Sequence, residues 1–245
     1  MSGPRVTSGE GSKQDYETPA DLISSIERRF GEIQFDLAAH RGNKKHRRYF
    51  APQEFVEKFD PDKTNSQSLI ESLVRRGAHL GEARAAVERA EAMGRETVIK
   101  VKNHDTEAHA LDAFKYDWAP LSNQFHDRRH GDLPGLLWLN CEFGDVPPWA
   151  RRCLEEGQRG ANIVLLTPAM VGSNWYRDLI ASRANVYLLN GRVMFDGKNV
   201  FPKDCMVSHF WPGASGMKFV WNWKNDEIVH AWRTTRLPGP SAYRS

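Results

Sequence analysis

The chain has 245 residues, of which 40% are hydrophobic and 11% aromatic, enough for a packed core. This composition excludes wholesale disorder and collagen-like repeats, and the length favours one domain or at most two small ones. The 34 Lys and Arg residues against 31 Asp and Glu residues give a net charge of +3, which permits an anionic partner without requiring one.

The N-terminal part predicts a flexible lead-in, a helix and a short strand. Residues 1–14 are polar and rich in Gly and Ser, and we expect them to be flexible. Apolar residues recur at helical spacing over Pro19–Phe30, with Thr18 as the expected N-cap and Gly31 as the end of the helix. Apolar and polar residues then alternate over Ile33–Leu37, as in a strand. This order favours an α/β layered domain.

Residues 53–110 differ in composition from the rest of the chain. Ser66–Arg76 and His79–Met93 are rich in Ala, Glu, Arg and Leu, and each carries one apolar stripe. Gly77 separates them. The pattern predicts a helical hairpin inserted into the main domain, either as a scaffold element with solvated charged faces or as a recognition element.

The second half of the chain alternates short apolar runs with helical segments. Strands are predicted at 136–139, 162–166, 185–189 and 205–211, and helices at Pro147–Gln158 and Ser173–Ser182. This alternation predicts right-handed crossovers on a largely parallel sheet that is buried by helices on both faces. We expect one domain over residues 15–225 and a mobile tail over residues 226–245.

Three strand ends carry side chains that suit ligand binding. In open α/β sheets, ligands bind beyond the carboxyl ends of strands. The candidate segments are Asp36-Leu37-Ala38-Ala39, Asn140-Cys141-Glu142-Phe143 and Thr167-Pro168-Ala169.

A series of short motifs resembles the phage-encoded DNA adenine-N6 methyltransferases, a branch of the S-adenosylmethionine-dependent amino-methyltransferases. The likeness covers about residues 15–211 apart from the insertion, and it implies a Rossmann-like methyltransferase sheet. The motifs are Tyr16-Glu17-Thr18-Pro19, Phe30-Gly31, Phe35-Asp36-Leu37-Ala38-Ala39, Tyr49-Phe50, Asp112-Ala113-Phe114, Trp118, Leu137-Trp138-Leu139-Asn140, Pro148-Trp149-Ala150, Pro168-Ala169 to Trp175, Leu189-Asn190-Gly191-Arg192, Phe195-Asp196-Gly197-Lys198 and Pro202-Lys203-Asp204-Cys205-Met206.

The resemblance implies a catalytic tetrapeptide at Asn140, Cys141, Glu142 and Phe143. Family members carry Asn or Asp, two prolines and an aromatic residue in this segment. The first side chain and a main-chain carbonyl accept hydrogen bonds from the target amine, and the aromatic ring stacks on the flipped base. Here Cys141 and Glu142 replace the two prolines, which frees the backbone torsion φ at both positions.

The resemblance also implies S-adenosyl-L-methionine as cofactor and no metal. It places Thr18 and Pro19 near the methionine moiety of the cofactor. Asp36 and Ala38 fall in the position of the glycine-rich loop, whose glycines this chain lacks. Asp112 supplies a carboxylate that faces the cofactor's adenine, and Phe114 a ring that lies against it.

Double-stranded DNA is the implied partner, and three basic or polar loops are candidate contacts. Basic side chains bind phosphates with little sequence preference, whereas Arg and Asn can read base edges. The candidate DNA-binding residues are Lys44, Lys45, Arg47, Arg48, Arg128, Arg129, Arg192 and Lys198.

Each assignment has a structural alternative. Asp36 and Asp112 could be strand-end or turn carboxylates, Thr18 a helix cap, and Asn140 a turn residue with Phe143 in the core. The basic run could be a solvated face. At the level of function, the alternatives are a catalytically degenerate methyltransferase fold that binds DNA or a partner, and an amino-methyltransferase acting on cytosine N4.

The location follows from what the sequence lacks. Cys141, Cys153 and Cys205 form no CxxC pair, so neither a zinc site nor a disulfide framework is indicated. No apolar run reaches the roughly 20 residues that span a bilayer, and no secretion signal is evident. We therefore expect a cytoplasmic protein, in a bacterial host cell if the chain is phage-encoded.

Overall fold

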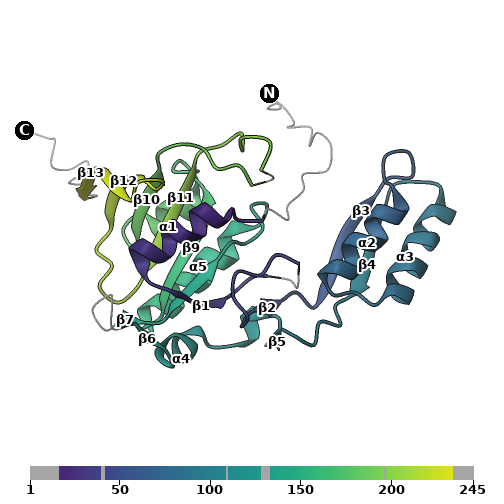
Figure 1. Cartoon of the computed structure of the whole chain (residues 1–245), viewed down its shortest axis with the longest axis horizontal. Coiled ribbons are helices and arrows are strands. Elements are labelled where there is room, and N and C mark those ends of the chain that lie inside the picture. The colour runs from purple at the N-terminus through teal and green to yellow at the C-terminus, as the bar shows by residue number, and fades with distance from the viewer. Residues whose placement is uncertain (1–16, 40–41, 109, 128–132, 196, 234–245) are drawn as a thin grey trace, which may run out of the picture. The chain divides into compact units, whose positions relative to one another are not determined.

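The computed structural model describes residues 17–39, 42–108, 110–127, 133–195 and 197–233 (Figure 1). It divides into two compact units, and the division falls inside strand β1 (Ile33–Asp36). The first unit comprises Phe35–Tyr116 together with the segment that ends at Thr18, and the second comprises Pro19–Gln34 and the chain from Asp117 onward. This division crosses the domain expected over residues 15–225, which stays a prediction.

A seven-stranded mixed sheet forms the centre of the second unit. Its order is β1-β8-β9-β11-β10-β12-β13. β8 pairs parallel to β9, and β10 pairs parallel to β12, whereas β11 is antiparallel to both β9 and β10. The further strands are β8 (Leu136–Leu139), β9 (Asn162–Pro168), β10 (Asn185–Leu189), β11 (Cys205–Phe210), β12 (Met217–Asn222) and β13 (Glu227–Arg233).

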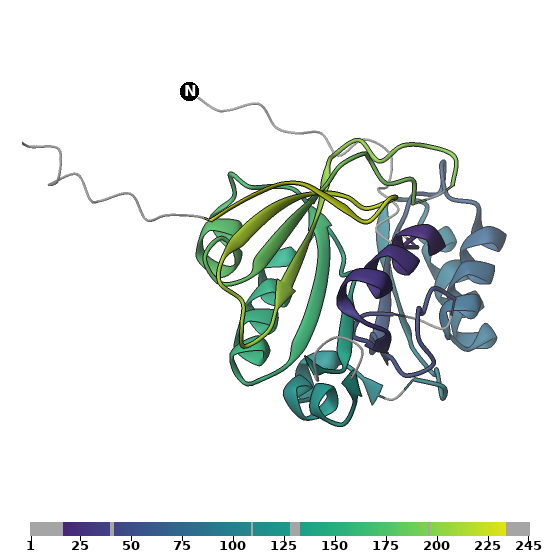
Figure 2. The ribbon, with the colours of Figure 1, turned by 60° about the vertical axis from the view of Figure 1, so that its left-hand side comes forward.

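Helices cover both faces of this sheet, as predicted (Figure 2, with α1 in purple). Successive residues of a strand point to opposite faces. On β11, His209 meets the ring of Phe30 from α1 (Ala20–Phe30), whereas the next residue, Phe210, lies against Gly157 of α5 (Val146–Gln158). Every residue of β8, β9 and β11 is buried, which explains their continuous apolar sequences.

Three expectations about this unit need correction. The fourth predicted strand is antiparallel, because an apolar run buried on both faces carries no information about direction. The expected tail is too long, since Glu227–Arg233 pairs with β12 as strand β13. The helix predicted at Ser173–Ser182 is shorter and forms the π-helical turn η3 (Tyr176–Ile180).

The first helix confirms its predicted span but not its predicted cap. α1 begins at Ala20 after Pro19, which occupies the N-cap position, and no side chain bonds to the first turn as a cap. The prediction that Thr18 caps this helix is therefore wrong. Gly31 ends the helix with φ 104°, a value that only glycine adopts at low cost.

The first unit contains the predicted insertion, which is not purely helical. α2 (Ser66–Arg76) and α3 (Leu80–Met93) form the expected hairpin, and an antiparallel pair of strands, β3 (Glu54–Phe59) and β4 (Thr97–Lys102), packs with them. Alternate residues of both strands join the helices in one hydrophobic core that includes Phe55, Phe59, Leu73, Val87 and Ile99. The insertion is thus a small α/β module.

The remaining elements are short. The first unit adds the parallel pair β2 (Phe50–Ala51) and β5 (Ala110–Leu111) and the 3-10 turn η1 (Ala113–Lys115). The second unit adds α4 (Trp118–Asn123) and the antiparallel pair β6 (His126–Asp127) and β7 (Leu133–Pro134).

A buried carboxylate joins two helices of the second unit. Glu156 of α5 is fully buried, and its Oε2 accepts hydrogen bonds from the backbone N–H groups of Trp118 and Ala119, at 2.9 and 2.8 Å, in the first turn of α4. Its Oε1 pairs with Arg152 and Arg159, both at 3.0 Å. Glu156, on α5, therefore provides the hydrogen-bond acceptor that the first backbone N–H groups of α4 lack within their own helix.

Replacing Glu156 by Ala removes one partner of this network and leaves buried groups unpaired. We expect a loss of about 3–5 kcal/mol in the free energy of unfolding, measured by urea denaturation. The matched control is the exposed neighbour Glu155→Ala, whose effect should stay within about 0.5 kcal/mol. Equal effects of the two substitutions would contradict this role.

Candidate functional site

The predicted catalytic tetrapeptide directly follows the carboxyl end of the buried strand β8. Asn140 and Phe143 are half-buried, Cys141 is buried and Glu142 is exposed. The Glu142 carbonyl accepts a hydrogen bond from the backbone N–H of Asp145 at 3.2 Å, just before α5 begins. The segment is thus a tight strand-to-helix turn at the sheet edge where α/β proteins bind ligands.

Phe143 belongs to an aromatic cluster. Its ring makes edge contacts with Phe195 and Phe201, at centroid distances of 5.7 and 5.6 Å, and these two rings meet each other at 5.4 Å. Both partners come from the segment between β10 and β11. The cluster fixes the orientation of a ring that stays partly exposed.

Cys141 cannot act as a nucleophile in this environment. Burial raises the pKa of its thiol to about 12, and the nearby carboxylates of Glu142 and Asp145 act in the same direction. The side chain stays protonated at neutral pH. Any polar contribution of this residue must come from its main chain.

In the first unit, Asp36 organises the loop that follows β1. Its Oδ2 accepts a hydrogen bond from the backbone N–H of Lys45 at 2.9 Å, and its Oδ1 accepts one from that of Ala38 at 3.3 Å. Burial raises the pKa of Asp36 to about 6, although these two hydrogen bonds act against the rise. Both oxygens therefore already bind the protein's own backbone.

Strand β2 joins the two predicted cofactor segments. On one side the backbone N–H of Ala39 donates to the carbonyl of Phe50 at 3.0 Å. Asp36 and Tyr49 also pair through their backbones in an isolated parallel β-bridge. On the other side β2 pairs with β5, and the N–H of Asp112 donates to the carbonyl of Ala51 at 2.9 Å. Residues 36–39 and 112–114 are separated in sequence by the insertion, but both segments bind to the same short strand, β2.

Asp112 has an unusual backbone conformation beside an exposed ring. Its φ is 83°, which a residue with a side chain rarely adopts and which clusters at functional positions. Its Oδ1 accepts a hydrogen bond from the N–H of Phe114 at 3.1 Å, and Phe114 is 41% exposed. A carboxylate and an accessible aromatic face therefore lie together.

The other predicted cofactor residues differ in accessibility. Thr18 is buried, whereas Pro19 and Ala38 are half-buried. Thr18, Asp36, Ala38, Asp112 and Phe114 fall in the first unit. Pro19 and the tetrapeptide fall in the second.

Several predicted DNA-binding residues have acidic partners within the chain. Lys44 pairs with Glu107 at 2.6 Å and Lys45 with Glu17 at 2.9 Å. Arg192 pairs with Asp204 at 3.3 Å while staying half-exposed.

The exposure of three other predicted DNA-binding residues is given by the structure. Arg47 and Lys198 are exposed, and Arg48 is half-buried. Arg128 and Arg129 lie outside the described residues.

A second group of polar side chains, Asn185, Tyr187, His209 and Trp211, lines a cavity that the sequence reasoning did not single out. All four stand in the predicted strands 185–189 and 205–211, which were assigned only as buried strands. The signal that was available is the polar residue inside an apolar run, since a buried Asn or His requires hydrogen-bond partners.

Comparison with known proteins adds no family assignment. No family model matches the chain, and no curated protein matches it. Among the described residues, no helix is both long and apolar enough to cross a membrane.

The pKa of Asp36 gives a pH-dependent stability. A carboxyl whose folded pKa is raised from 3.8 to about 6 favours the protonated form, so its stabilising effect is full below pH 3.8 and is lost as the pH rises to about 6. Relative to Asp36→Asn, we expect the wild-type free energy of unfolding to fall by roughly 3 kcal/mol over this window. Urea denaturation at pH 4 and pH 7 measures it.

The control for this measurement is Asp62→Asn, an exposed carboxyl of the same unit. Its pH profile should follow the wild type. A wild-type profile that parallels Asp36→Asn would show that Asp36 is solvated.

Proposed function

We propose that the chain is an S-adenosylmethionine-dependent DNA methyltransferase that transfers a methyl group to the N6 amine of adenine, in the cytoplasm of a bacterial host. The observation that carries the proposal is the position of Asn140. The motif order of the resemblance puts an amide and an aromatic ring after a strand, and that strand is the fully buried β8. A rigid strand end is where preorganised groups are most effective.

Asn140 and the main chain of the tetrapeptide act on the target amine. The lone pair of an exocyclic base amine is delocalised into the ring, which makes the amine a poor nucleophile. The side-chain oxygen of Asn140 and the carbonyl of Cys141 accept its N–H hydrogen bonds and hold the lone pair toward the methyl donor. Alignment of this kind supplies much of the rate enhancement in transfer reactions.

Phe143 supplies the surface on which the base stacks. The base must leave the duplex, and an aromatic ring offsets part of the lost stacking. Contacts with Phe195 and Phe201 keep the ring in one orientation, so little conformational freedom is lost when the base binds.

The residues of the first unit suit the proposed cofactor. S-adenosylmethionine, when bound, supplies an activated methyl group. Asp112 offers a carboxylate that can accept from an adenine amine, although its Oδ1 binds the Phe114 N–H and its Oδ2 lies 3.5 Å from Lys115, and Phe114 offers an exposed aromatic face for stacking. The strained backbone at Asp112 supports a functional role. Asp36 contributes by shaping the loop over residues 36–45, since both its oxygens are already used.

A second candidate function is DNA binding without transfer. The contacts of Phe143 with two other phenylalanines are also those of an ordinary core residue, and Cys141 and Glu142 lack the rigidity of two prolines. In this case the chain binds DNA, and no methyl group is transferred. Transfer assays on the wild type separate the two candidates.

The key test is a pair of substitutions at Asn140. Asn140→Ala removes the acceptor and should lower methyl transfer to DNA by at least about 100-fold. Asn140→Asp keeps an acceptor that the family also uses and should retain measurable transfer. Tritium transfer from labelled cofactor to DNA of mixed sequence measures both, and calorimetry should show cofactor affinity within about twofold of wild type for each.

Equal transfer by wild type and Asn140→Ala would exclude Asn140 as the acceptor. Cofactor binding by the wild type with no transfer at all would favour the second candidate.

Phe114 provides an independent test of the cofactor site. Phe114→Ala should weaken cofactor binding by about tenfold, because base–aromatic stacking contributes about 1–3 kcal/mol. The control is Val56→Ala, an exposed apolar residue of the same unit, which should leave the affinity unchanged. Unaltered affinity in Phe114→Ala, measured by calorimetry, would remove this residue from the site.

A further inference from the structure

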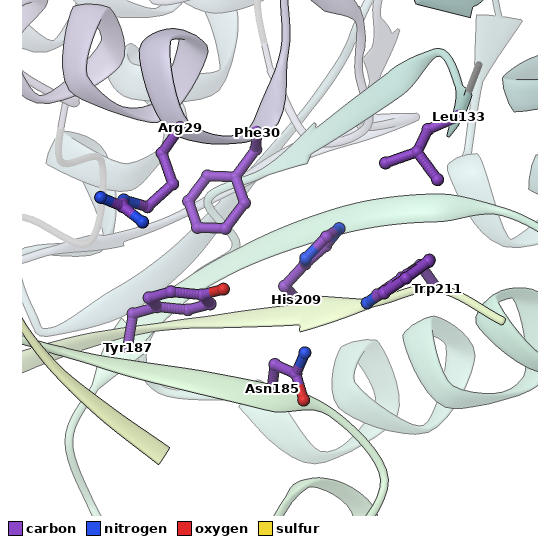
Figure 3. Close-up of a pocket in the computed structure, with 7 residues that line it drawn as sticks. All are labelled: Arg29, Phe30, Leu133, Asn185, Tyr187, His209 and Trp211. Atoms are coloured by element: carbon purple, nitrogen blue, oxygen red, sulfur yellow. The ribbon is translucent and has the colours of Figure 1, made fainter. Parts of the chain in front are cut away.

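Figure 3 shows a cavity of about 230 Å³ in the second unit. It lies at the end of the sheet's strands opposite to the end that carries Asn140. β8, β9 and β10 run in the same direction, since β11 is antiparallel to both β9 and β10. Asn140 follows the carboxyl end of β8, whereas Asn185 begins β10 and Trp211 follows the end of the antiparallel β11. The cavity is lined by Arg29, Phe30, Leu133, Asn185, Tyr187, His209 and Trp211.

His209 presents an acceptor. Asn162 donates from its Nδ2 to the carbonyl of Pro134 at 2.8 Å, which identifies its Oδ1 as the atom that faces the His209 Nε2 at 2.7 Å. Nε2 therefore carries the proton. Burial lowers the pKa of His209 to about 3, so the ring is neutral and Nδ1 keeps its lone pair.

Asn185 presents donors. Its Oδ1 accepts two backbone hydrogen bonds, from the N–H groups of Ser215 and Met217, each at 3.1 Å. These contacts fix the amide orientation and turn its NH₂ group toward the cavity, as Figure 3 shows. The orientation follows from hydrogen bonding and not from the shape of the side chain.

Two more polar groups face the same space. The Nε1–H of Trp211 is buried and has no hydrogen-bond partner among the described residues. The hydroxyl of Tyr187 points into the cavity in Figure 3 and makes no hydrogen bond within the described part of the chain. A buried donor without a partner, such as the Trp211 indole, is rare in proteins and calls for a ligand or water.

Most of the wall is made of flat aromatic side chains. The ring of Phe30 meets those of Tyr187 and His209 edge-on at 4.9 and 5.0 Å, and Trp211 stacks on His209 at 5.8 Å with an interplanar angle of 13°. The one cation of the lining, Arg29, is held by Asp226 through Nε–Oδ1 at 2.6 Å and Nη2–O at 2.8 Å. An anionic ligand therefore meets no free positive charge.

We propose that this cavity binds the lactam edge of a nucleobase, as found in inosine, guanine, thymine and uracil. The lactam N–H donates to Nδ1 of His209, and the adjacent carbonyl accepts from the amide of Asn185 and the indole of Trp211. The aromatic walls cover the faces of the ring. Adenine lacks the carbonyl and presents an acceptor nitrogen opposite Nδ1, so the site rejects it. This proposal does not rest on methyl transfer.

The test uses two nucleosides that differ only at this edge. Inosine carries the N–H and carbonyl where adenosine carries a ring nitrogen and an amine. Calorimetric titration of the full chain should show binding of inosine and thymidine, with adenosine at least about tenfold weaker. Equal affinity for inosine and adenosine, or no binding of either, would overturn the proposal.

Asn185→Asp locates the binding at this cavity. Aspartate keeps the two backbone hydrogen bonds but replaces the NH₂ donors by an oxygen that repels the lactam carbonyl, so inosine affinity should fall at least about tenfold. The matched control is Gln158→Glu, an exposed residue of α5 on the other face of the sheet. Circular dichroism confirms that each variant is folded.

A single-stranded oligonucleotide distinguishes a base within a nucleic acid from a free nucleoside. An oligothymidylate that binds more tightly than thymidine, with the same loss in Asn185→Asp, assigns the cavity to a base within a nucleic acid. Binding of thymidine alone assigns it to a free nucleoside. A loss in Gln158→Glu equal to that in Asn185→Asp would show that charge, and not the cavity, governs the affinity, and would contradict the proposal.

Discussion

Burial of the central strands on both faces is the constraint on which the second unit depends. β8, β9 and β11 expose no residue, because α1 and α5 cover the two faces of the sheet. Polar side chains can therefore reach a ligand only at the two ends of these strands. One end carries Asn140 and Phe143. The other carries the cavity around His209. The two candidate sites of this unit are therefore both located by the same packing.

Some polar groups inside this apolar layer are held by specific partners, whereas the hydroxyls of Thr167 and Ser208 are buried without a hydrogen bond in the described part of the chain. His209 and Asn162 bond to each other across neighbouring strands, and Glu156 ties α4 to α5. Such contacts contribute little net stability when satisfied and cost much when broken. They fix side-chain orientation, which is what a binding site requires.

In the first unit, the short strand β2 has the corresponding role. It lies between the loop shaped by Asp36 and the turn at Asp112, and it brings together residues that the inserted module separates in sequence. The module has its own hydrophobic core, which includes residues of both its helices and both its strands.

The sequence predicted most elements because their periodicity was strong. The spans of α1, α2, β8 and β9 follow from helical spacing or from continuous apolar runs. Direction and capping could not be predicted in the same way: the apolar run of β11 suits either direction, and both Thr18 and Pro19 suit the start of a helix. β13 was missed because most of its residues are exposed and its pattern is weak.

At the sites, the sequence predicted correctly that residues 140–143 follow the end of a buried strand, whereas their catalytic role stays a prediction. The partners of Asp36 and Lys44 could not be predicted, because they depend on which distant backbone and side-chain groups the fold brings near. Asn185 and His209 were overlooked for a related reason. A polar residue within an apolar run reveals its role only when its hydrogen-bond partners are known.

The identity of the methylated product is the sharpest test of the proposed transfer to the adenine amine of DNA. DNA of mixed sequence is incubated with the protein and S-adenosylmethionine that carries a deuterated methyl group, digested to nucleosides and analysed by mass spectrometry. We expect the label in N6-methyldeoxyadenosine. Label in a cytosine nucleoside, or unlabelled nucleosides from a protein that binds the cofactor, would contradict it.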